Sequence, residues 1–79
     1  MVARLVFLGR LEDVAGAPER AVAPGPLEAI LAALDPALAV ELLGDRVRIA
    51  LNGRLLTDHG GVVLAEGDEL AFLPPVSGG

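Results

Sequence analysis

The last residues of the chain carry its clearest potential for chemistry. The 79-residue sequence ends Phe72-Leu73-Pro74-Pro75-Val76-Ser77-Gly78-Gly79. Two consecutive prolines favour an extended path out of the preceding strand, and the small residues after them suit a narrow channel. The α-carboxylate of Gly79 has no Cβ beside it, so its carbon is open to attack from either face once ATP has activated it as an acyl-adenylate. We therefore expect Gly79 to be the reactive group and the rest of the chain to be its carrier.

An inert, frayed end is the alternative interpretation of this segment, because most chain termini are poorly ordered. The chain contains 10 glycines, so a terminal Gly-Gly alone is weak support for a function. Gly-Gly directly after a strand that two prolines terminate is a stronger signal. When extended, the segment 74–79 reaches roughly 20 Å beyond the strand.

Side chains elsewhere in the chain offer little catalytic chemistry. The absence of cysteine excludes a disulfide framework, a thiolate nucleophile and a cysteine-ligated metal. The single histidine, His59, lies in a glycine-rich loop without a second ligand and is expected to be an exposed polar residue. Glu66, Asp68 and Glu69 form an acidic run that can bind a cation or act in acid–base catalysis, although such runs are more often simply solvated. We expect no metal site and no enzyme built from the chain's own side chains.

The composition narrows the range of partners. The formal net charge of -5 argues against a nucleic-acid module and against a basic membrane anchor. No apolar run reaches the length of a membrane span, and the first residues lack the pattern of a signal peptide. We therefore expect a soluble cytoplasmic protein. All six basic residues are arginine, so the chain offers no lysine amine as an acyl acceptor.

The apolar pattern alternates between strand and helix periods. Alternation and β-branched residues predict strands over 2–8, 19–23, 46–51, 54–57 and 69–73. An apolar face with helical spacing predicts the main helix, formed by Leu27, Ile30, Leu31 and Leu34. Short helical segments are expected over 11–15 and 37–43, a type I′ turn at Asn52-Gly53, and loop over 58–68. The resulting fold class is α+β, a roll in which a mixed sheet of four to five strands packs on one main helix plus short helical segments. We expect one domain over 1–73 and an extended tail over 74–79.

The period of two also assigns the strand faces. Phe7 and Phe72 are expected to point into the core. The outward residues of three neighbouring strands would form an apolar patch edged by arginine, which is typical of a partner site. Its expected members are Arg4, Val6, Leu8, Arg48, Ala50, Ala71 and Leu73. A long loop or the second helix covering this face is the alternative.

These motifs resemble a known family. The order of elements and the terminal Gly-Gly resemble the β-grasp, ubiquitin-like sulfur carriers. The ending from Gly67 to Gly79 resembles that of the small subunit of molybdopterin synthase, as do the opening Leu5–Gly16 and the turn Leu51-Asn52-Gly53. The related carrier of the thiamin pathway shares Gly-Gly but usually lacks the preceding Pro-Pro, while the stretch 58–64 departs from the family pattern.

The resemblance implies a mechanism and partners. A ubiquitin-activating-like enzyme would adenylate Gly79 with ATP and Mg²⁺, and a persulfide donor would convert it to a thiocarboxylate. The tail, with Pro74, Pro75, Val76, Ser77 and Gly78, would enter the large synthase subunit and donate sulfur to cyclic pyranopterin monophosphate. The family's complex is a heterotetramer built on a dimer of large subunits. No permanently bound cofactor is implied.

Three hypotheses remain open at this stage. The chain is a sulfur carrier for molybdopterin or for another pathway, a ubiquitin-like modifier conjugated through Gly79 to a partner lysine, or an interaction domain with an inert tail. The mass of the intact protein after expression with an activating enzyme distinguishes them.

Overall fold

The secondary structure consists of short elements joined by tight turns. The structure is a computed structural model, and it describes residues 1–58 and 60–75. Within this part of the chain the elements are, in order, β1 (Ala3–Phe7), α1 (Arg10–Ala15), β2 (Glu19–Val22), β3 (Gly25–Pro26), α2 (Leu27–Ala32), α3 (Pro36–Leu42), β4 (Arg48–Leu51), β5 (Arg54–Leu56), β6 (Val63–Leu64) and β7 (Glu69–Leu73). No helix in these described ranges is long and apolar enough to span a membrane.

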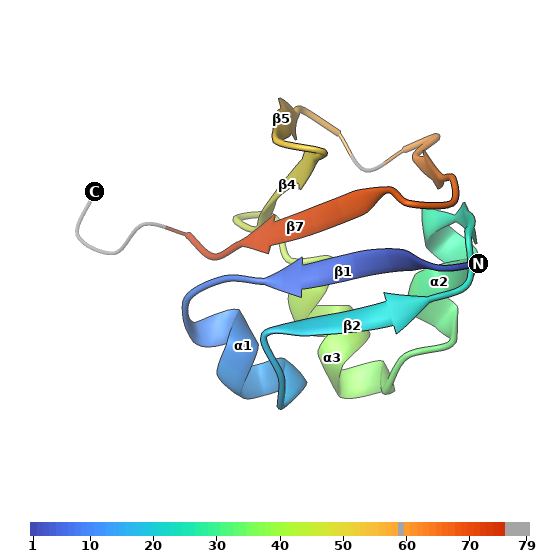
Figure 1. Ribbon diagram of the computed structural model, residues 1–79. Helices are drawn as coiled ribbons and strands as arrows, with labels where there is room; N and C mark the ends of the chain where they lie inside the picture. Colours follow the sequence, from blue (N-terminus) through green and yellow to red (C-terminus); the bar gives the residue numbers. More distant parts are fainter. Residues whose placement is uncertain (59, 76–79) are drawn as a thin grey trace.

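The main sheet has the strand order β2-β1-β7-β4-β5 in the described part of the chain. The central pair, β1 and β7, is parallel, whereas β2, β4 and β5 each pair antiparallel with their neighbours. Figure 1 shows the sheet in front of α2 and α3, with α1 near the end of β1. This arrangement is the ubiquitin-like β-grasp fold, which confirms the fold class expected from the sequence.

The core lies between the inner face of the sheet and the helices. Alternate residues of β1 and β7 are buried, while the residues between them are exposed or half-buried, as the period of two predicts. The rings of Phe7 and Phe72 stack with centroids 5.8 Å apart. The buried hydrophobic residues are Ala3, Leu5, Phe7, Leu11, Leu27, Ile30, Leu31, Leu34, Leu38, Leu42, Val47, Ile49, Leu64, Leu70 and Phe72.

Two short helices, α2 and α3, lie on either side of Asp35. The apolar face from Leu27 to Leu34 is buried as predicted, but α2 ends at Ala32 and is only six residues long. After Ala32 the backbone tightens, because the N–H groups of Ala33 and Leu34 donate to the carbonyls of Ile30 and Leu31, three residues back. Pro36 then prevents the helix from continuing, because the residue before a proline is pushed out of the helical region. Asp35 has φ -54° and ψ 130°, which is extended backbone. The seven-residue α3 then begins at Pro36 and buries Leu38 and Leu42 in the core.

A second, two-stranded sheet was not expected from the sequence. β3 pairs antiparallel with β6, with Gly25 opposite Leu64 and Pro26 opposite Val63. The sequence predicted loop over 58–68 and no strand over 25–26, because a strand of two residues is too short to show an alternating pattern. Leu64 is 1% exposed, so its burial in the core holds this pairing in place.

A polar network fixes the start of β7. Asn52 and Gly53 both have positive φ, at 49° and 85°, which confirms the type I′ turn. The Asn52 side chain donates to Asp68 Oδ1 at 3.0 Å and accepts from the backbone N–H of Glu69 at 2.9 Å. The other Asp68 oxygen accepts from the backbone N–H of Ala65 at 2.8 Å. The turn between β4 and β5 is thereby tied to the turn before β7.

This network makes stability depend on pH through Asp68. The hydrogen bonds from Ala65 and then Asn52 hold the pKa of the Asp68 carboxyl below its ordinary value. A lowered pKa in the folded state means that the unfolded chain binds more protons in acid. The stabilisation is present above the ordinary aspartate pKa and is lost as the pH falls through the lower pKa of the folded protein.

We expect Asp68→Asn to lower the urea midpoint at pH 7 and to flatten its decline as the pH falls below the ordinary aspartate pKa. The two hydrogen bonds are accepted by different carboxylate oxygens, and the amide replaces one of these oxygens by an NH2 donor, so one of the bonds is lost. Glu66→Gln is the matched control, because no hydrogen bond to its side chain is formed in the described residues and it should keep the wild-type slope. Parallel pH profiles for wild-type protein and Asp68→Asn would contradict this assignment.

Candidate functional site at the tail exit and the outer face of the sheet

The fold places the base of the tail at the end of a central strand. β7 lies between β1 and β4 and ends at Leu73, and the chain leaves the sheet through Pro74 and Pro75. Figure 1 shows the chain leaving β7 at the edge of the molecule. Proline cannot donate to a strand ladder, so the two prolines end the pairing there. The predicted site residues Val76, Ser77, Gly78 and Gly79 lie outside the described residues.

The absence of a side chain at Gly9 leaves room for the ring of Pro74 where the chain leaves the sheet. Gly9 has φ 54° and ψ -135°, a backbone region that is costly for residues with a Cβ. A Cβ at this position would lie 2.9 Å from Cγ of Pro74. The backbone N–H of the neighbouring Leu8 donates to the carbonyl of Phe72 at 3.1 Å. The turn after β1 is therefore packed directly against the first residue of the tail.

We expect Gly9→Ala to lower the free energy of unfolding by about 1–3 kcal/mol and to displace Pro74. Gly16→Ala is the control for a positive φ without a nearby side chain, because Gly16 has φ 80° and ψ 6° in the left-handed region and open space around the position of a Cβ. The control carries only the conformational cost, so urea unfolding should show the smaller loss. Equal losses in the two variants would show that Pro74 does not restrict residue 9.

A row of small and apolar side chains crosses the outer face of the sheet. Val6 is opposite Ala71, Ala71 is opposite Ala50, and Ala50 is opposite Leu55. Partners in a ladder project to the same face, so these four residues form one continuous row. The helices cover only the other face, and Leu55 is 61% exposed. This face is therefore open within the described part of the chain.

The next row leads to the tail. Leu73 is opposite Arg48, and Leu8 follows Phe7, the partner of Phe72. Leu8 is 41% exposed, and Leu73, Pro74 and Pro75 are half-buried. The structure thus brings the predicted apolar patch and the base of the tail together on one surface.

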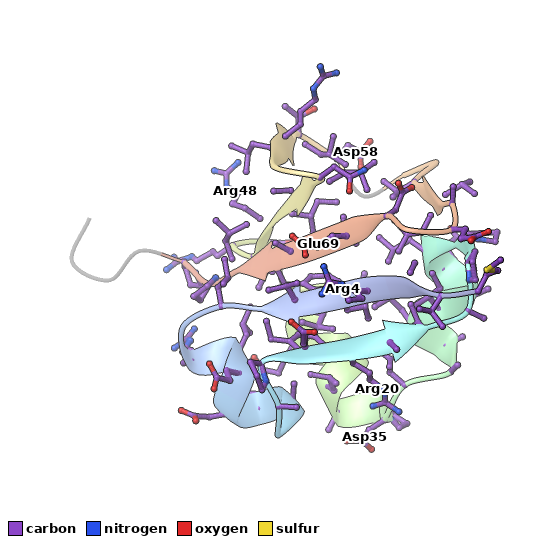
Figure 2. All side chains as sticks on the ribbon, viewed as in Figure 1. Arg4, Arg20, Asp35, Arg48, Asp58 and Glu69 are labelled. Carbon is purple, nitrogen blue, oxygen red and sulfur yellow. The ribbon has the colours of Figure 1, made fainter. Side chains whose placement is uncertain are left out.

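Arg4 is held in ion pairs on the same face. Its guanidinium lies 2.8 Å from Glu69 Oε1 on β7 and 3.4 Å from Glu19 Oε1 on β2. Figure 2 shows Arg4 beside Glu69, where β1 and β7 run side by side. All three side chains are about half exposed, so each pair contributes little to stability, roughly 0–1 kcal/mol. The positive charge of Arg4 is largely balanced within its own sheet.

Two other arginines lie beside the tail. A hollow of about 340 Å³ is lined by Asp45, Arg46, Arg48, Pro74 and Pro75. Neither arginine forms an ion pair with any residue in 1–58 or 60–75. Figure 2 shows Arg48 projecting from the sheet on the side of β4. The tail therefore leaves the domain beside positive charge, although the chain as a whole is acidic.

The comparison with protein families agrees with this geometry. The model described as the ThiS family matches residues 5–79, from the middle of β1 to the final Gly-Gly. The chain belongs to the ThiS family. No curated protein sequence gives a significant match.

Several solved structures are similar to this ThiS-family chain. The crystal structure of SAMP1 from Haloferax volcanii is 28% identical, with a TM-score of 0.78 and complete coverage of both chains. The solution structure of small archaeal modifier protein 1 from Methanosarcina acetivorans is 26% identical, with a TM-score of 0.74, and covers 100% of this chain and 99% of its own. The Haloferax volcanii HVO 2177 protein is 27% identical, with a TM-score of 0.74, over 100% of this chain and 87% of its own. The class supported for this chain is a ubiquitin-like sulfur carrier or modifier.

One member of the patch on this ThiS-family chain was missed by the sequence reasoning. Leu55 extends the row formed by Val6, Ala71 and Ala50, but the predicted patch does not include it. The Asn52-Gly53 turn holds the necessary signal, because a two-residue loop pairs 51 with 54 and therefore 50 with 55.

Two of the three residues in the acidic run of the ThiS-family chain are held by structural contacts. Asp68 is bound by Asn52 and Ala65, and Glu69 pairs with Arg4. Residues 1–58 and 60–75 contain no group of three side chains arranged to hold a metal ion. His59 lies outside the described residues.

Proposed function

We propose that this protein carries sulfur on its C-terminal glycine for the synthesis of molybdopterin. The family match that runs through Gly79 carries this proposal. The placement of the tail's base at the end of a central strand supports it, because a rigid sheet then presents the reactive end. The apolar outer face beside that base is suited to a partner that receives the tail.

The proposed chemistry takes place at the carboxylate of Gly79. The carboxylate attacks the α-phosphorus of ATP, with Mg²⁺ bound to the phosphates, and forms an acyl-adenylate with release of pyrophosphate. The terminal sulfur of a donor persulfide attacks the acyl carbon, and AMP leaves. A thiol then reduces the resulting acyl disulfide and releases the thiocarboxylate. The activating enzyme and the sulfur donor are separate proteins, so the chain itself needs no resident cofactor.

The proposed acceptor is cyclic pyranopterin monophosphate in the large subunit of molybdopterin synthase. The Pro-Pro sequence before the last four residues supports this acceptor over a thiamin precursor. The outer row and Leu8 would dock on the large subunit while the tail enters its active site. The hollow with Arg46 and Arg48 would meet an acidic rim on that subunit, which favours rapid encounter.

Protein modification is the second candidate. Three of the similar structures are named SAMP1 or small archaeal modifier protein 1, and they match 95–100% of this chain. In that function the activated Gly79 would form an isopeptide bond with a lysine of another protein. The absence of lysine from this chain means that it could not form chains on itself through lysine.

The test is the intact mass of the protein after incubation with an activating enzyme, ATP, Mg²⁺ and a persulfide donor. Replacement of one oxygen by sulfur is the expected result. Adding the large synthase subunit and the pterin substrate should then produce molybdopterin and return the carrier to its original mass. High-mass adducts without a thiocarboxylate would favour the modifier, and thiocarboxylate without molybdopterin would favour another sulfur acceptor.

We expect Leu8→Glu to weaken association with the large subunit by at least about tenfold while leaving the fold intact. Leu8 is 41% exposed beside the tail exit, and burial of an unpaired carboxylate in an interface is costly. Calorimetric titration against the large subunit measures the affinity, and circular dichroism checks the fold.

Val40→Glu is the matched control for this prediction. Val40 is 72% exposed on α3, on the helical side of the molecule. The Val40→Glu variant should leave the affinity for the large subunit unchanged. Wild-type affinity for Leu8→Glu, or equal weakening by both variants, would place the interface away from the outer face of the sheet.

A further inference from the structure

An apolar groove lies along the open edge of the sheet, away from the tail and from the outer face. Its volume is about 330 Å³, near the lower end of the range of roughly 300–1,000 Å³ for ligand-binding clefts. β2 and the loop after it line one side, and α2 with Leu34 lines the other. No step of the proposed sulfur chemistry uses this groove.

The backbone of β2 is available for pairing. β2 is the outermost strand on its side of the sheet. The N–H of Phe7 donates to the carbonyl of Pro18 at 2.8 Å. In an antiparallel pair of strands, every second residue forms hydrogen bonds with its partner. The backbone groups of Arg20 and Val22 therefore bond to β1. The N–H and carbonyl groups of Glu19 and Ala21 therefore point away from the sheet. No backbone hydrogen bond to them from residues 1–58 or 60–75 occupies this edge.

The side chains beside this edge fit an added strand. Arg20 and Val22 are opposite Leu5 and Ala3, which are buried, so both project to the helical side. A strand placed beside β2 would direct every second side chain the same way, into the groove. Ala29, Ala33 and Ile30 line the facing wall, and the small alanines leave room for branched apolar side chains there.

Arg20 supplies the only ionised side chain that lines the groove. It forms no ion pair within the described ranges 1–58 and 60–75. Figure 2 shows Arg20 and Asp35 on the same side of the molecule below β2, but no ion pair joins them. A groove with one unpaired guanidinium and otherwise uncharged walls is complementary to a ligand with apolar side chains and one carboxylate.

We propose that the edge of β2 and this groove form a second docking site, which binds an extended acidic segment of another protein by strand addition. The segment pairs with Glu19 and Ala21, inserts apolar side chains at alternate positions and places a carboxylate against Arg20. A second copy of this chain is a poorer occupant. Antiparallel pairing of two β2 strands about Ala21 would put Val22, not a carboxylate, opposite Arg20. The site is independent of the sulfur-carrier function.

The test uses a short synthetic peptide with alternating valine and serine and two aspartates at one end. Nuclear magnetic resonance titration with the wild-type chain should shift the amides of β2 and α2. Arg20→Glu should weaken binding by at least about tenfold. The matched control, Arg54→Glu, reverses an exposed charge on β5 at the opposite edge and should leave the affinity unchanged.

Two further measurements test the backbone pairing. Ala21→Pro removes an N–H that points away from β1, so it should weaken binding by at least about tenfold while keeping the β1 ladder. The same peptide with alternate backbone nitrogens methylated should fail to bind the wild-type chain, a result that does not depend on how any variant folds.

Four outcomes would overturn the proposal. They are equal binding of the methylated peptide, equal binding of a peptide with lysines in place of the aspartates, absence of binding at millimolar concentrations, and amide shifts confined to Val6 and Leu55 on the outer face. Dimerisation of the peptide-free protein through β2, seen by analytical ultracentrifugation, would also overturn it, because a second copy would then be the occupant.

Discussion

Phe72→Ala should lower the free energy of unfolding by about 3–5 kcal/mol. Phe72 is 0% exposed and stacks on Phe7, and these two are the only aromatic residues in the chain. Removing the ring leaves a cavity at the centre of the sheet, where the rigid strands β1, β7 and β4 cannot close it. A domain of this size has a total stability of roughly 5–15 kcal/mol, so the variant should be close to unfolding.

Urea unfolding followed by far-ultraviolet circular dichroism measures this effect without an intrinsic tryptophan. Val40→Ala is the control for loss of apolar side-chain volume, because Val40 is 72% exposed on α3. Its effect should stay within about 0.5 kcal/mol. An unchanged midpoint for Phe72→Ala would mean that the outer and inner faces of β7 have been exchanged.

The strand faces could be predicted because a shift of one residue moves a whole set of side chains to the opposite face. The alternation in Ala3–Phe7 and Glu69–Leu73 therefore left one assignment that buries both phenylalanines, and the structure confirms it. The short pairing of β3 with β6 could not be predicted in this way. The β3–β6 pairing depends on the burial of Leu64 against residues distant in the sequence. The alternation of apolar residues within a short segment carries no information about such contacts.

The sequence also predicts part of the candidate site but not all of it. The apolar patch followed from the strand faces, but the ion pairs of Arg4 did not, because they join Glu19 and Glu69 from two different strands. Sequence reasoning assigned Arg4 to the rim of a partner site. That assignment stays a prediction. The structure adds that the Arg4 guanidinium pairs with Glu19 and Glu69 of its own sheet, and that Arg46 and Arg48 line the hollow beside Pro74 and Pro75.

The tail itself provides the test with the largest functional effect. Appending one alanine after Gly79, or deleting Gly79, should reduce thiocarboxylate formation and molybdopterin production by at least about 100-fold. One residue changes the reach of an extended chain by about 3.3 Å, whereas misplacement of a reacting atom by about 1 Å already has a large cost. An added alanine also puts a methyl group beside the carbonyl that must pass through the channel.

The stability of these variants should not change. The last buried residue in the described part of the chain is Phe72, so no known core contact depends on the altered positions. Gly78→Val should block the reaction without moving the carboxylate, because its branched side chain obstructs a narrow channel. Ser77→Ala is the matched control, since it keeps both the length and the small side chain, and it should retain activity. Normal thiocarboxylate formation and molybdopterin production by the alanine-extended protein would contradict the assignment of Gly79 as the reactive residue, because its carboxyl group is then no longer the terminal one.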